Sequence, residues 1–292
     1  MYMQVNSVST APILIIGKTG QLARALSYEL KAEDTLFLDR PSLDLSKPIL
    51  DLPNCRGLIL AAAYTAVDMA ETESKLANQV NGVAVGQIAK ICARRDIPLV
   101  HISTDYVFDG NAAKPWSPKD DTAPLNAYGQ SKWLGEQAII KSKANAAILR
   151  TSWVFDGTGQ NFLTTMLRLS KTQNRISVIS DQIGRPTYAG HLAQACIAAL
   201  KGLQLDRAKA GLYHATNTGT PVSWADFSRA IFKITGQDIE VIDTLSRNYP
   251  TAAARPAYSV MDTQAFEAMF GYHFPNWRSG LDAAFKDRER LL

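Results

Sequence analysis

The sequence predicts an α/β fold in which a doubly wound parallel sheet is followed by a smaller mixed α/β domain. Short apolar runs recur in the first half of the chain, at 12–16, 57–63 and 98–102, and a helical pattern follows each, directly or after a loop. Such runs are typical of strands that are buried on both faces, as in parallel sheets. We therefore expect one parallel sheet with helices packed on its faces.

The distribution of apolar and polar residues divides the chain into three parts. Residues 1–10 are polar and lack the apolar centre of a signal peptide, so we expect a disordered extension there. We assign 11–152 to the domain that holds the parallel sheet. The pattern is less regular over 153–292, where we expect mainly a second domain, with elements near 188–203 returning to the first.

The composition excludes several classes of protein. With 46% apolar and 20% charged residues and a net charge of +4, the chain resembles a soluble globular protein and gives no reason to expect nucleic-acid binding. No apolar run approaches the roughly 20 residues that cross a bilayer, so we expect no membrane contact. Cys55, Cys92 and Cys196 are widely spaced without a metal or redox motif, which fits a reducing cytoplasm.

A glycine turn follows the first predicted strand. The segment Gly17-Lys18-Thr19-Gly20-Gln21-Leu22-Ala23 leads from that strand into a helical pattern through Leu30. This layout places backbone N–H groups and a helix N-terminus against a pyrophosphate, as in Rossmann-type dinucleotide-binding domains. The spacing is G-x-x-G-x-x-A, in which Ala23 is small enough for close packing of helix on strand. A plain turn is the alternative interpretation.

The second predicted strand, 35–39, ends in an acid. An acid at this place would bond the ribose hydroxyls of the adenosine and favour NADH. Arg40 is its neighbour and would instead meet a 2′-phosphate, so NADH and NADPH both remain open. Asp44 follows soon after in a loop that would bring it to the adenine. A solvated strand end is the alternative for Asp39.

Small residues continue the next strand. The run 57–63 ends in Ala61-Ala62-Ala63 and leads into Tyr64-Thr65, and small side chains there let a flat cofactor approach the backbone. A long helical pattern follows from about residue 71 to Arg95. Asn81 lies inside it, either on the surface or bonding the backbone near the site.

The fourth predicted strand brings a hydroxyl to the same edge. Thr104 directly follows the strand 98–102, and open α/β sheets bind ligands at the carboxyl ends of their strands. Its hydroxyl would bond a substrate carbonyl oxygen. His101 is expected to be a core residue, and the loop 106–126 is expected to line the substrate site.

Tyr128 and Lys132 form the predicted acid/base centre. Four residues apart on a helix, they lie on one face, so the ammonium would approach the phenol oxygen. A positive charge roughly 4 Å from the ionised phenol oxygen stabilises it by about 4 kcal/mol at an effective dielectric near 20. We therefore expect Lys132 to lower the pKa of Tyr128 toward working pH. An ordinary helix start with an extended lysine is the alternative.

Several motifs agree in order along the chain. They are Gly17-Lys18-Thr19-Gly20-Gln21-Leu22, Ala61 to Asp68, Ser103-Thr104-Asp105-Tyr106-Val107-Phe108, Tyr128-Gly129-Gln130-Ser131-Lys132, Arg150 to Phe155, Asp181 to Thr187 and Arg255 to Ser259. The set resembles the extended short-chain dehydrogenase/reductases and, more closely, the dTDP-4-dehydrorhamnose reductase family. The resemblance covers roughly residues 13 to 285.

The resemblance implies reduction of a 4-keto nucleotide sugar, dTDP-4-dehydro-L-rhamnose, by NADPH or NADH. Tyr128 would protonate the carbonyl oxygen, Lys132 would hold the nicotinamide ribose, and Thr104 would align the reacting oxygen. The implied cofactor contacts are Gly17, Thr19, Gly20, Gln21, Leu22, Asp39, Asp44, Leu45, Ala62, Ala63, Tyr64 and Thr65. The implied substrate contacts are Thr104, Asp105, Trp153, Asn161, Arg185 and Arg255, the last three of which could instead be structural. The second domain would then be the substrate-binding one.

Other readings stay open within this fold. A sugar dehydratase would carry a second acid after Thr104, where this chain has Asp105 and then Tyr106. A non-catalytic NADP-binding regulatory subunit would not need Thr104, Tyr128 and Lys132 together. A reductase of another 4-keto sugar remains open. The resemblance allows a homodimer, but Mg²⁺ is not supported because the first helix has no acid before Glu29.

Overall fold

A six-stranded parallel sheet forms the larger part of the computed structural model, which describes residues 11–291. Its strands are β1 (Ile13–Ile16), β2 (Thr35–Leu38), β3 (Gly57–Leu60), β4 (Leu99–Thr104), β5 (Ala146–Thr151) and β10 (Gly211–His214), in the order β10-β5-β4-β3-β1-β2. From β1 the chain passes first to β2 and then back beyond β1 to β3. This reversal creates a switch point between β1 and β3, where doubly wound sheets bind ligands.

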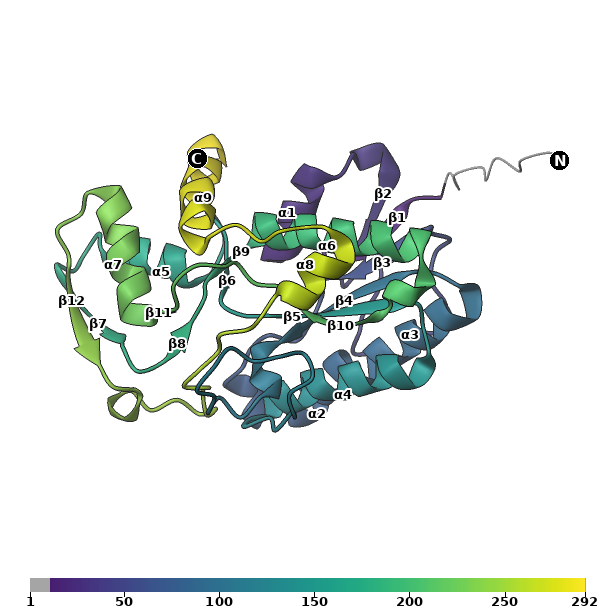
Figure 1. Cartoon of the computed structure of the whole chain (residues 1–292), viewed down its shortest axis with the longest axis horizontal. Helices are drawn as coiled ribbons and strands as arrows, with labels where there is room; N and C mark the ends of the chain where they lie inside the picture. The colour runs from purple at the N-terminus through teal and green to yellow at the C-terminus, as the bar shows by residue number, and fades with distance from the viewer. Residues whose placement is uncertain (1–10, 292) are drawn as a thin grey trace.

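Helices cover both faces of this sheet (Figure 1). On one face lie α1 (Gln21–Glu29) and α6 (Ala189–Leu205), and on the other α3 (Ala84–Arg95) and α4 (Ala127–Ser142). Within β1, Leu14 and Ile16 pack toward α3, whereas Ile15 packs toward α1 and α6. Because both faces are buried, the strand is apolar at every position, and the predicted doubly wound α/β fold is confirmed.

The predicted long helix before β4 is interrupted. The chain forms a 3₁₀ turn (Met69–Glu71), α2 (Ser74–Asn78), a π-helical turn (Gln79–Val83) and then α3. Asn81 is buried in the π-helical turn. A side chain at Gly135 of α4 would place its Cβ 2.2 Å from the Asn81 carbonyl oxygen, so glycine allows this helix to approach closely.

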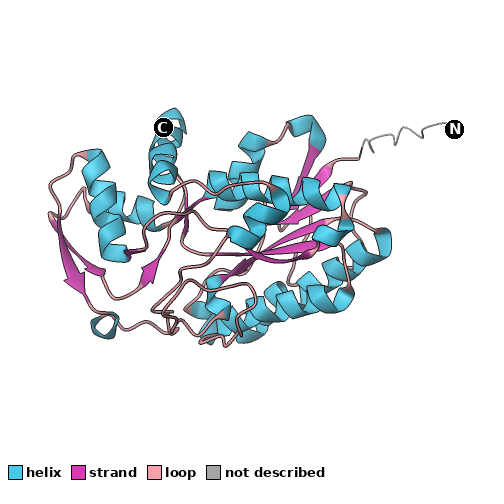
Figure 2. Cartoon of the chain, viewed as in Figure 1, coloured by secondary structure: helices cyan, strands magenta, loops and turns pink. Residues whose placement is uncertain are grey.

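A second lobe packs around its own core of Phe155, Phe227, Ile231, Trp277 and Leu281. Its helices are α5 (Phe162–Leu169), α7 (Trp224–Thr235) and α9 (Trp277–Leu291). Its strands pair as β7 (Arg175–Ile179) with β12 (Glu240–Thr244), β8 (Ile183–Gly184) with β11 (Val222–Ser223), and β6 (Val154–Phe155) with β9 (Thr187–Tyr188). These short magenta arrows lie apart from the large sheet (Figure 2).

The chain returns to the large sheet after entering the second lobe. Helix α6 shares a core with β1 and β3, and both β10 and α8 (Gln264–Phe270) also lie at this sheet. Short 3₁₀ turns occur at Ala32–Asp34, Asp105–Val107, Arg207–Lys209 and Ser246–Asn248. A division of the chain near residue 152 remains a prediction, and the expected extension at 1–10 lies outside the described residues. No helix between residues 11 and 291 is long and apolar enough to span a bilayer.

Candidate active site

Two adjoining cavities lie along the carboxyl ends of the parallel strands. Their volumes are about 280 and 580 Å³, and their walls share Thr19, Gly20, Ala61, Ala62, Ala63 and Thr65. The smaller cavity extends to the end of β2, and the larger one to the ends of β4 and β5. Together they form a groove that crosses the switch point of the sheet.

The glycine turn forms the floor between these cavities. Gly17 adopts a φ of +112°, and a Cβ there would lie 3.1 Å from the backbone nitrogen of Ala62, so a larger residue is strained on both counts. Gly20 is the N-cap of α1 and leaves the first N–H groups of that helix facing the groove without a side-chain cap. A helix N-terminus of this kind attracts a phosphate group. The turn therefore fits a dinucleotide pyrophosphate.

The smaller cavity contains the residues predicted to meet the adenosine. Asp39, Asp44 and Leu45 all line it, and so does Arg40. The Asp44 carboxylate accepts hydrogen bonds from the backbone N–H and the hydroxyl of Ser46, at 2.9 and 2.7 Å, and these bonds hold its pKa below the usual value. Since an acid and an arginine share this wall, both NADH and NADPH remain compatible with it.

The wall after β3 differs from the prediction at one residue. Ala62, Ala63 and Thr65 line both cavities, whereas Tyr64 lines neither. The Tyr64 hydroxyl donates to Glu73 at 2.7 Å, and its backbone N–H and carbonyl bond the Asn81 side chain. The hydroxyl of Tyr64 is thus engaged with Glu73, and the predicted place of Tyr64 along the nicotinamide half remains a prediction.

Thr104, Tyr128 and Lys132 converge on the larger cavity and all line it. Helix α4 begins after Asn126, whose side chain accepts from the Gly129 N–H at 2.7 Å. A Cβ at Gly129 would lie 2.2 Å from the Tyr106 carbonyl oxygen, so glycine lets α4 start directly against the turn that follows β4. This contact brings the Tyr128 phenol close enough to the Thr104 hydroxyl to affect its pKa.

The electrostatics of the tyrosine correct one expectation. Burial raises the pKa of Tyr128, the nearby Asp105 carboxylate raises it further, and the Thr104 hydrogen bond opposes the rise. Lys132 does not contribute, because its ammonium donates to the Ile102 carbonyl oxygen at 2.5 Å. The predicted lowering of the Tyr128 pKa by Lys132 is thus wrong for this structure. The phenol is therefore fully protonated near neutral pH, but the raised pKa makes it a weaker acid than a free tyrosine.

The surroundings of Lys132 shift the pKa of its ammonium. Burial lowers the pKa of its ammonium to about 8, and the Glu136 carboxylate one turn further along α4 raises it in part. Lys132 is nevertheless mainly protonated near neutral pH.

An ion pair that the sequence analysis did not predict lies next to Lys132. Glu136 and Arg150 are 0% and 3% exposed, and the guanidinium donates to both carboxylate oxygens at 2.9 and 2.7 Å. The Ser103 hydroxyl donates to the same carboxylate at 2.5 Å. Two signals point to the pair: Glu136 lies four residues after Lys132, and Arg150 interrupts an apolar strand.

Asn81 is a second residue whose role was left open. Its side-chain amide donates to the Tyr64 carbonyl at 3.0 Å and to the Ser131 hydroxyl at 2.9 Å. Asn81 therefore connects the segment after β3 to helix α4. Its partner on that helix, Ser131, lies between Tyr128 and Lys132 in sequence. Of the two alternatives left open for Asn81, bonding the backbone near the site is the one that the structure shows, although the π-helical turn that buries this residue has no simple sequence signal.

Besides Thr104, two predicted substrate residues reach the larger cavity. Asp105 lines it next to Thr104, whose hydroxyl donates to the Asp105 carboxylate at 3.0 Å, and burial raises the pKa of this acid to about 6. Trp153 lines it with a φ of +51°, its indole stacked on Trp224 at 3.5 Å between ring centroids. Val67, Thr151, Ser152 and Gln160 also line the wall, and the sequence analysis did not name them as contacts.

The other three predicted substrate residues lie outside the cavity wall. Asn161 caps α5 and uses its amide group on Asp156 and Thr158. The Arg185 guanidinium donates to the carbonyl oxygens of Gly219 and Met261. In each case bonds within the chain occupy the polar group, so this placement does not support the predicted diphosphate contact.

Arg255 is held beside the site rather than in it. Its guanidinium pairs with Asp68 at 2.6 Å and contacts the Tyr106 hydroxyl at 3.4 Å. Tyr106 in turn lies edge-on to Tyr128, with ring centroids 5.6 Å apart. Arg255 therefore supports a neighbour of the catalytic tyrosine. Across residues 11–291 no group of three or more His, Cys, Asp or Glu is arranged to hold a metal ion.

The sequence and structure are similar to known proteins over nearly their full length. The sequence model of the RmlD substrate binding domain matches residues 11–290. A dTDP-4-dehydrorhamnose reductase of Sinorhizobium fredii is 38% identical over 278 residues, covering 91% of this chain and 93% of the relative. A solved dTDP-4-dehydrorhamnose reductase of Clostridium acetobutylicum has a TM-score of 0.88 and 32% identity, covering 96% of this chain and 100% of that one.

A second solved structure carries the dinucleotide. The dTDP-4-dehydrorhamnose reductase of Bacillus anthracis, in complex with NADP, has a TM-score of 0.85 and 33% identity, covering 95% of this chain and 99% of that one. The resemblance stated from the motifs is confirmed by these matches. The chain belongs to the RmlD substrate binding domain family.

Proposed function

We propose that this protein reduces the 4-keto group of dTDP-4-dehydro-L-rhamnose to give dTDP-L-rhamnose, with NADPH or NADH as the reductant. The convergence of Thr104, Tyr128 and Lys132 on one cavity, continuous with the cavity at the glycine turn, carries this proposal. Relatives that match nearly the whole chain have this activity in their names, and one was solved with NADP.

The dinucleotide would lie along the floor of the groove. The pyrophosphate would face Thr19, Gly20, Gln21 and Leu22 above the turn at Gly17, where no Cβ intrudes. The adenosine would meet Asp39, Asp44 and Leu45, and the nicotinamide half would pass Ala62, Ala63 and Thr65. When bound there, the nicotinamide supplies a hydride to the sugar ketone.

The residues of the chain position the ketone and supply the proton. Tyr128 keeps its proton near neutral pH and donates it to the carbonyl oxygen as negative charge develops. The Thr104 hydroxyl lines the same cavity as the Tyr128 phenol and would hold the same oxygen in place. The protonated Lys132 stabilises the developing charge from within the cavity. Asp105, next to Thr104, and Trp153 would contact the sugar.

Cellular location and assembly are separate proposals. The thiols of Cys55, Cys92 and Cys196 are free and buried, which supports a reducing cytoplasm. A homodimer is expected from the family resemblance alone. Cell fractionation and light scattering of the purified protein test these two proposals.

A direct assay tests the proposed reaction. Purified protein is mixed with dTDP-4-dehydrorhamnose and NADPH or NADH, and loss of the reduced-nicotinamide absorbance is followed. We expect one dinucleotide oxidised for each dTDP-L-rhamnose formed. A protein that binds the dinucleotide but oxidises none of it would instead be a binding subunit, and formation of an isomer without net oxidation would indicate an epimerase.

A further inference from the structure

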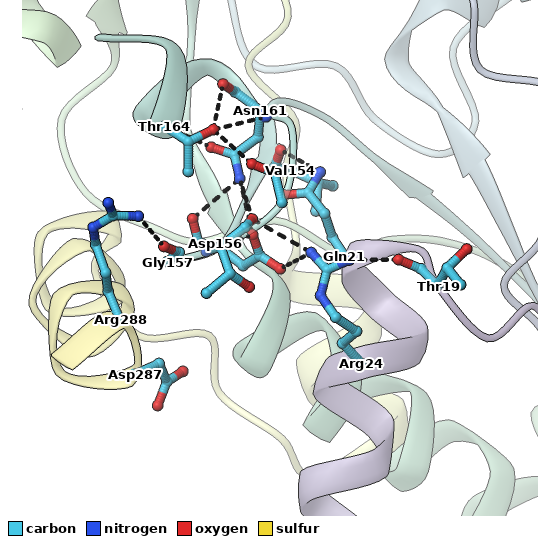
Figure 3. A network of polar contacts seen from close by, with 12 residues as sticks. Thr19, Gln21, Arg24, Val154, Asp156, Gly157, Asn161, Thr164, Asp287 and Arg288 are labelled. Atoms are coloured by element: carbon cyan, nitrogen blue, oxygen red, sulfur yellow. Dashed lines mark hydrogen bonds and ion pairs between the residues drawn. The ribbon is translucent and has the colours of Figure 1, made fainter. Parts of the chain in front are cut away.

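A polar network joins the glycine turn to the loop that begins the second lobe (Figure 3). Arg24 extends from α1, just after the glycine turn, and its guanidinium donates to the Thr19 carbonyl oxygen. The other end of the same group pairs with the Asp156 carboxylate at 2.6 Å and contacts the Thr158 carbonyl at 3.3 Å. One planar side chain therefore bridges the glycine turn, which lines the groove, and the loop that holds Asp156 and Thr158, which lies beside it.

The network continues to helix α5. The second oxygen of the Asp156 carboxylate accepts from the Asn161 amide at 2.8 Å, and Asn161 caps α5 by accepting from the Thr164 N–H at 3.1 Å. Asp156 is only 9% exposed, and burial raises its pKa while the Arg24 and Asn161 hydrogen bonds lower it. The carboxylate thus depends on both partners.

The loop is shaped to receive Arg24. Gly159 adopts a φ of +72°, and a Cβ there would lie 2.5 Å from the terminal Nη2 of Arg24. In parallel, the Gln21 amide donates to the Val154 carbonyl at 3.3 Å. Arg24 and Gln160 both line the larger cavity. This segment directly follows Trp153, so its position sets one wall of the proposed sugar site.

We infer that Arg24 and Asp156 are positioning residues that couple dinucleotide binding to nucleotide-sugar binding. The Thr19 carbonyl that Arg24 binds belongs to the turn that a dinucleotide would contact, so its binding would stabilise the Arg24–Asp156 bridge and, through it, the loop 155–161. The second ligand then meets an ordered wall and binds more tightly, and the reciprocal effect must be equal. This inference rests on the proposed function, whose ligands it uses.

Binding of dTDP-L-rhamnose tests the inference, because this product cannot accept a hydride from NADPH. Its Kd is measured by calorimetry with and without saturating NADPH. For the wild type we expect NADPH to tighten the binding about 5-fold or more, within the usual range of coupling between sites. The effect is expressed as the ratio of the Kd without NADPH to the Kd with NADPH. In Arg24→Gln and Asp156→Asn we expect this ratio to fall close to one. Arg24→Lys should give an intermediate ratio, since a lysine lacks the fork that reaches both partners.

Arg288 provides a matched control. It donates to the Gly157 carbonyl at 3.1 Å from α9, so it contacts the same loop but not the glycine turn (Figure 3). Arg288→Gln should keep the wild-type ratio. Asp156→Asn preserves size and lies outside the dinucleotide groove, so it carries the test even if Arg24→Gln does not fold.

The outcomes separate the inference from the proposed function. A wild-type enzyme that reduces the ketone but shows a ratio of one overturns the inference alone. So does a wild-type ratio in both Arg24→Gln and Asp156→Asn, or an equal loss in Arg288→Gln, which would mean that any disturbance of the loop has the same effect. A wild-type protein that oxidises no NADPH overturns the proposed function and the inference together.

Discussion

Removing the charge of Glu136 should destabilise the protein strongly. Its carboxylate is completely buried and accepts two hydrogen bonds from Arg150 and one from Ser103. In Glu136→Gln the Arg150 guanidinium stays 3% exposed and loses its counter-charge. Breaking a buried pair by removing one partner costs about 3–5 kcal/mol of the free energy of unfolding. With an unfolding entropy of about 2.1 cal/mol/K for each of the 292 residues, that loss lowers Tm by roughly 5–8 °C.

An exposed pair in the same chain supplies the control. Arg207 and Asp96 also form a short ion pair, at 2.5 Å, but their side chains are 56% and 77% exposed. Arg207→Gln should cost less than about 1 kcal/mol, because water screens the charges. Urea unfolding of the three proteins at neutral pH measures both effects. Equal losses in the two variants would refute the reasoning from burial.

Glu136→Gln should also change the pH dependence of catalysis. Glu136 is the group that raises the pKa of Lys132, so its neutralisation lets that pKa fall further below about 8. Lys132 then loses its proton at a lower pH. The alkaline limb of the kcat/KM profile, which reports groups of the free enzyme, should shift to lower pH in Glu136→Gln. An unmoved limb would show that Lys132 does not control it.

Four further predictions concern the site. Tyr128→Phe removes only the proton donor, so kcat should fall by about 10²–10⁴ while the Kd of NADPH from fluorescence titration stays constant; near-normal kcat would remove Tyr128 from this role. In the wild type, kcat/KM should decrease as pH rises through about 8, the pKa to which burial lowers Lys132. Because the unfolded chain keeps this proton up to its higher pKa, Lys132 makes the free energy of unfolding rise with pH above about 8, and Lys132→Met should flatten that rise. Asp39→Asn should shift the ratio of kcat/KM values toward NADPH, and an unchanged ratio would place Asp39 outside the adenosine pocket.

Much of the fold could be predicted because its signals are local. The strand 13–16 is buried on both faces, and its unbroken run of apolar residues predicts this burial. Tyr128 and Lys132 could be paired because a helix places residues four apart on one face. Gly17 could be assigned because the turn needs a positive φ beside the backbone of the next strand.

The rest depends on partners that are distant in sequence. Asn161 and Arg185 have suitable side chains for a diphosphate, but their bonds to Asp156, Gly219 and Met261 appear only in the folded chain. The pKa of Tyr128 depends on burial and on Asp105, which a helical spacing does not contain. Arg24 was missed because Asp156 lies 132 residues away and no motif joins them.

Hydride transfer to the sugar is the central claim, and isotope labelling tests it most directly. The protein is incubated with dTDP-4-dehydrorhamnose and NADPH that carries deuterium at the transferable position of the nicotinamide. NMR of the isolated dTDP-rhamnose should show the deuterium bound at C4 of the sugar, with none lost to water. Product without deuterium at C4, or recovery of the labelled dinucleotide unchanged, would contradict the account.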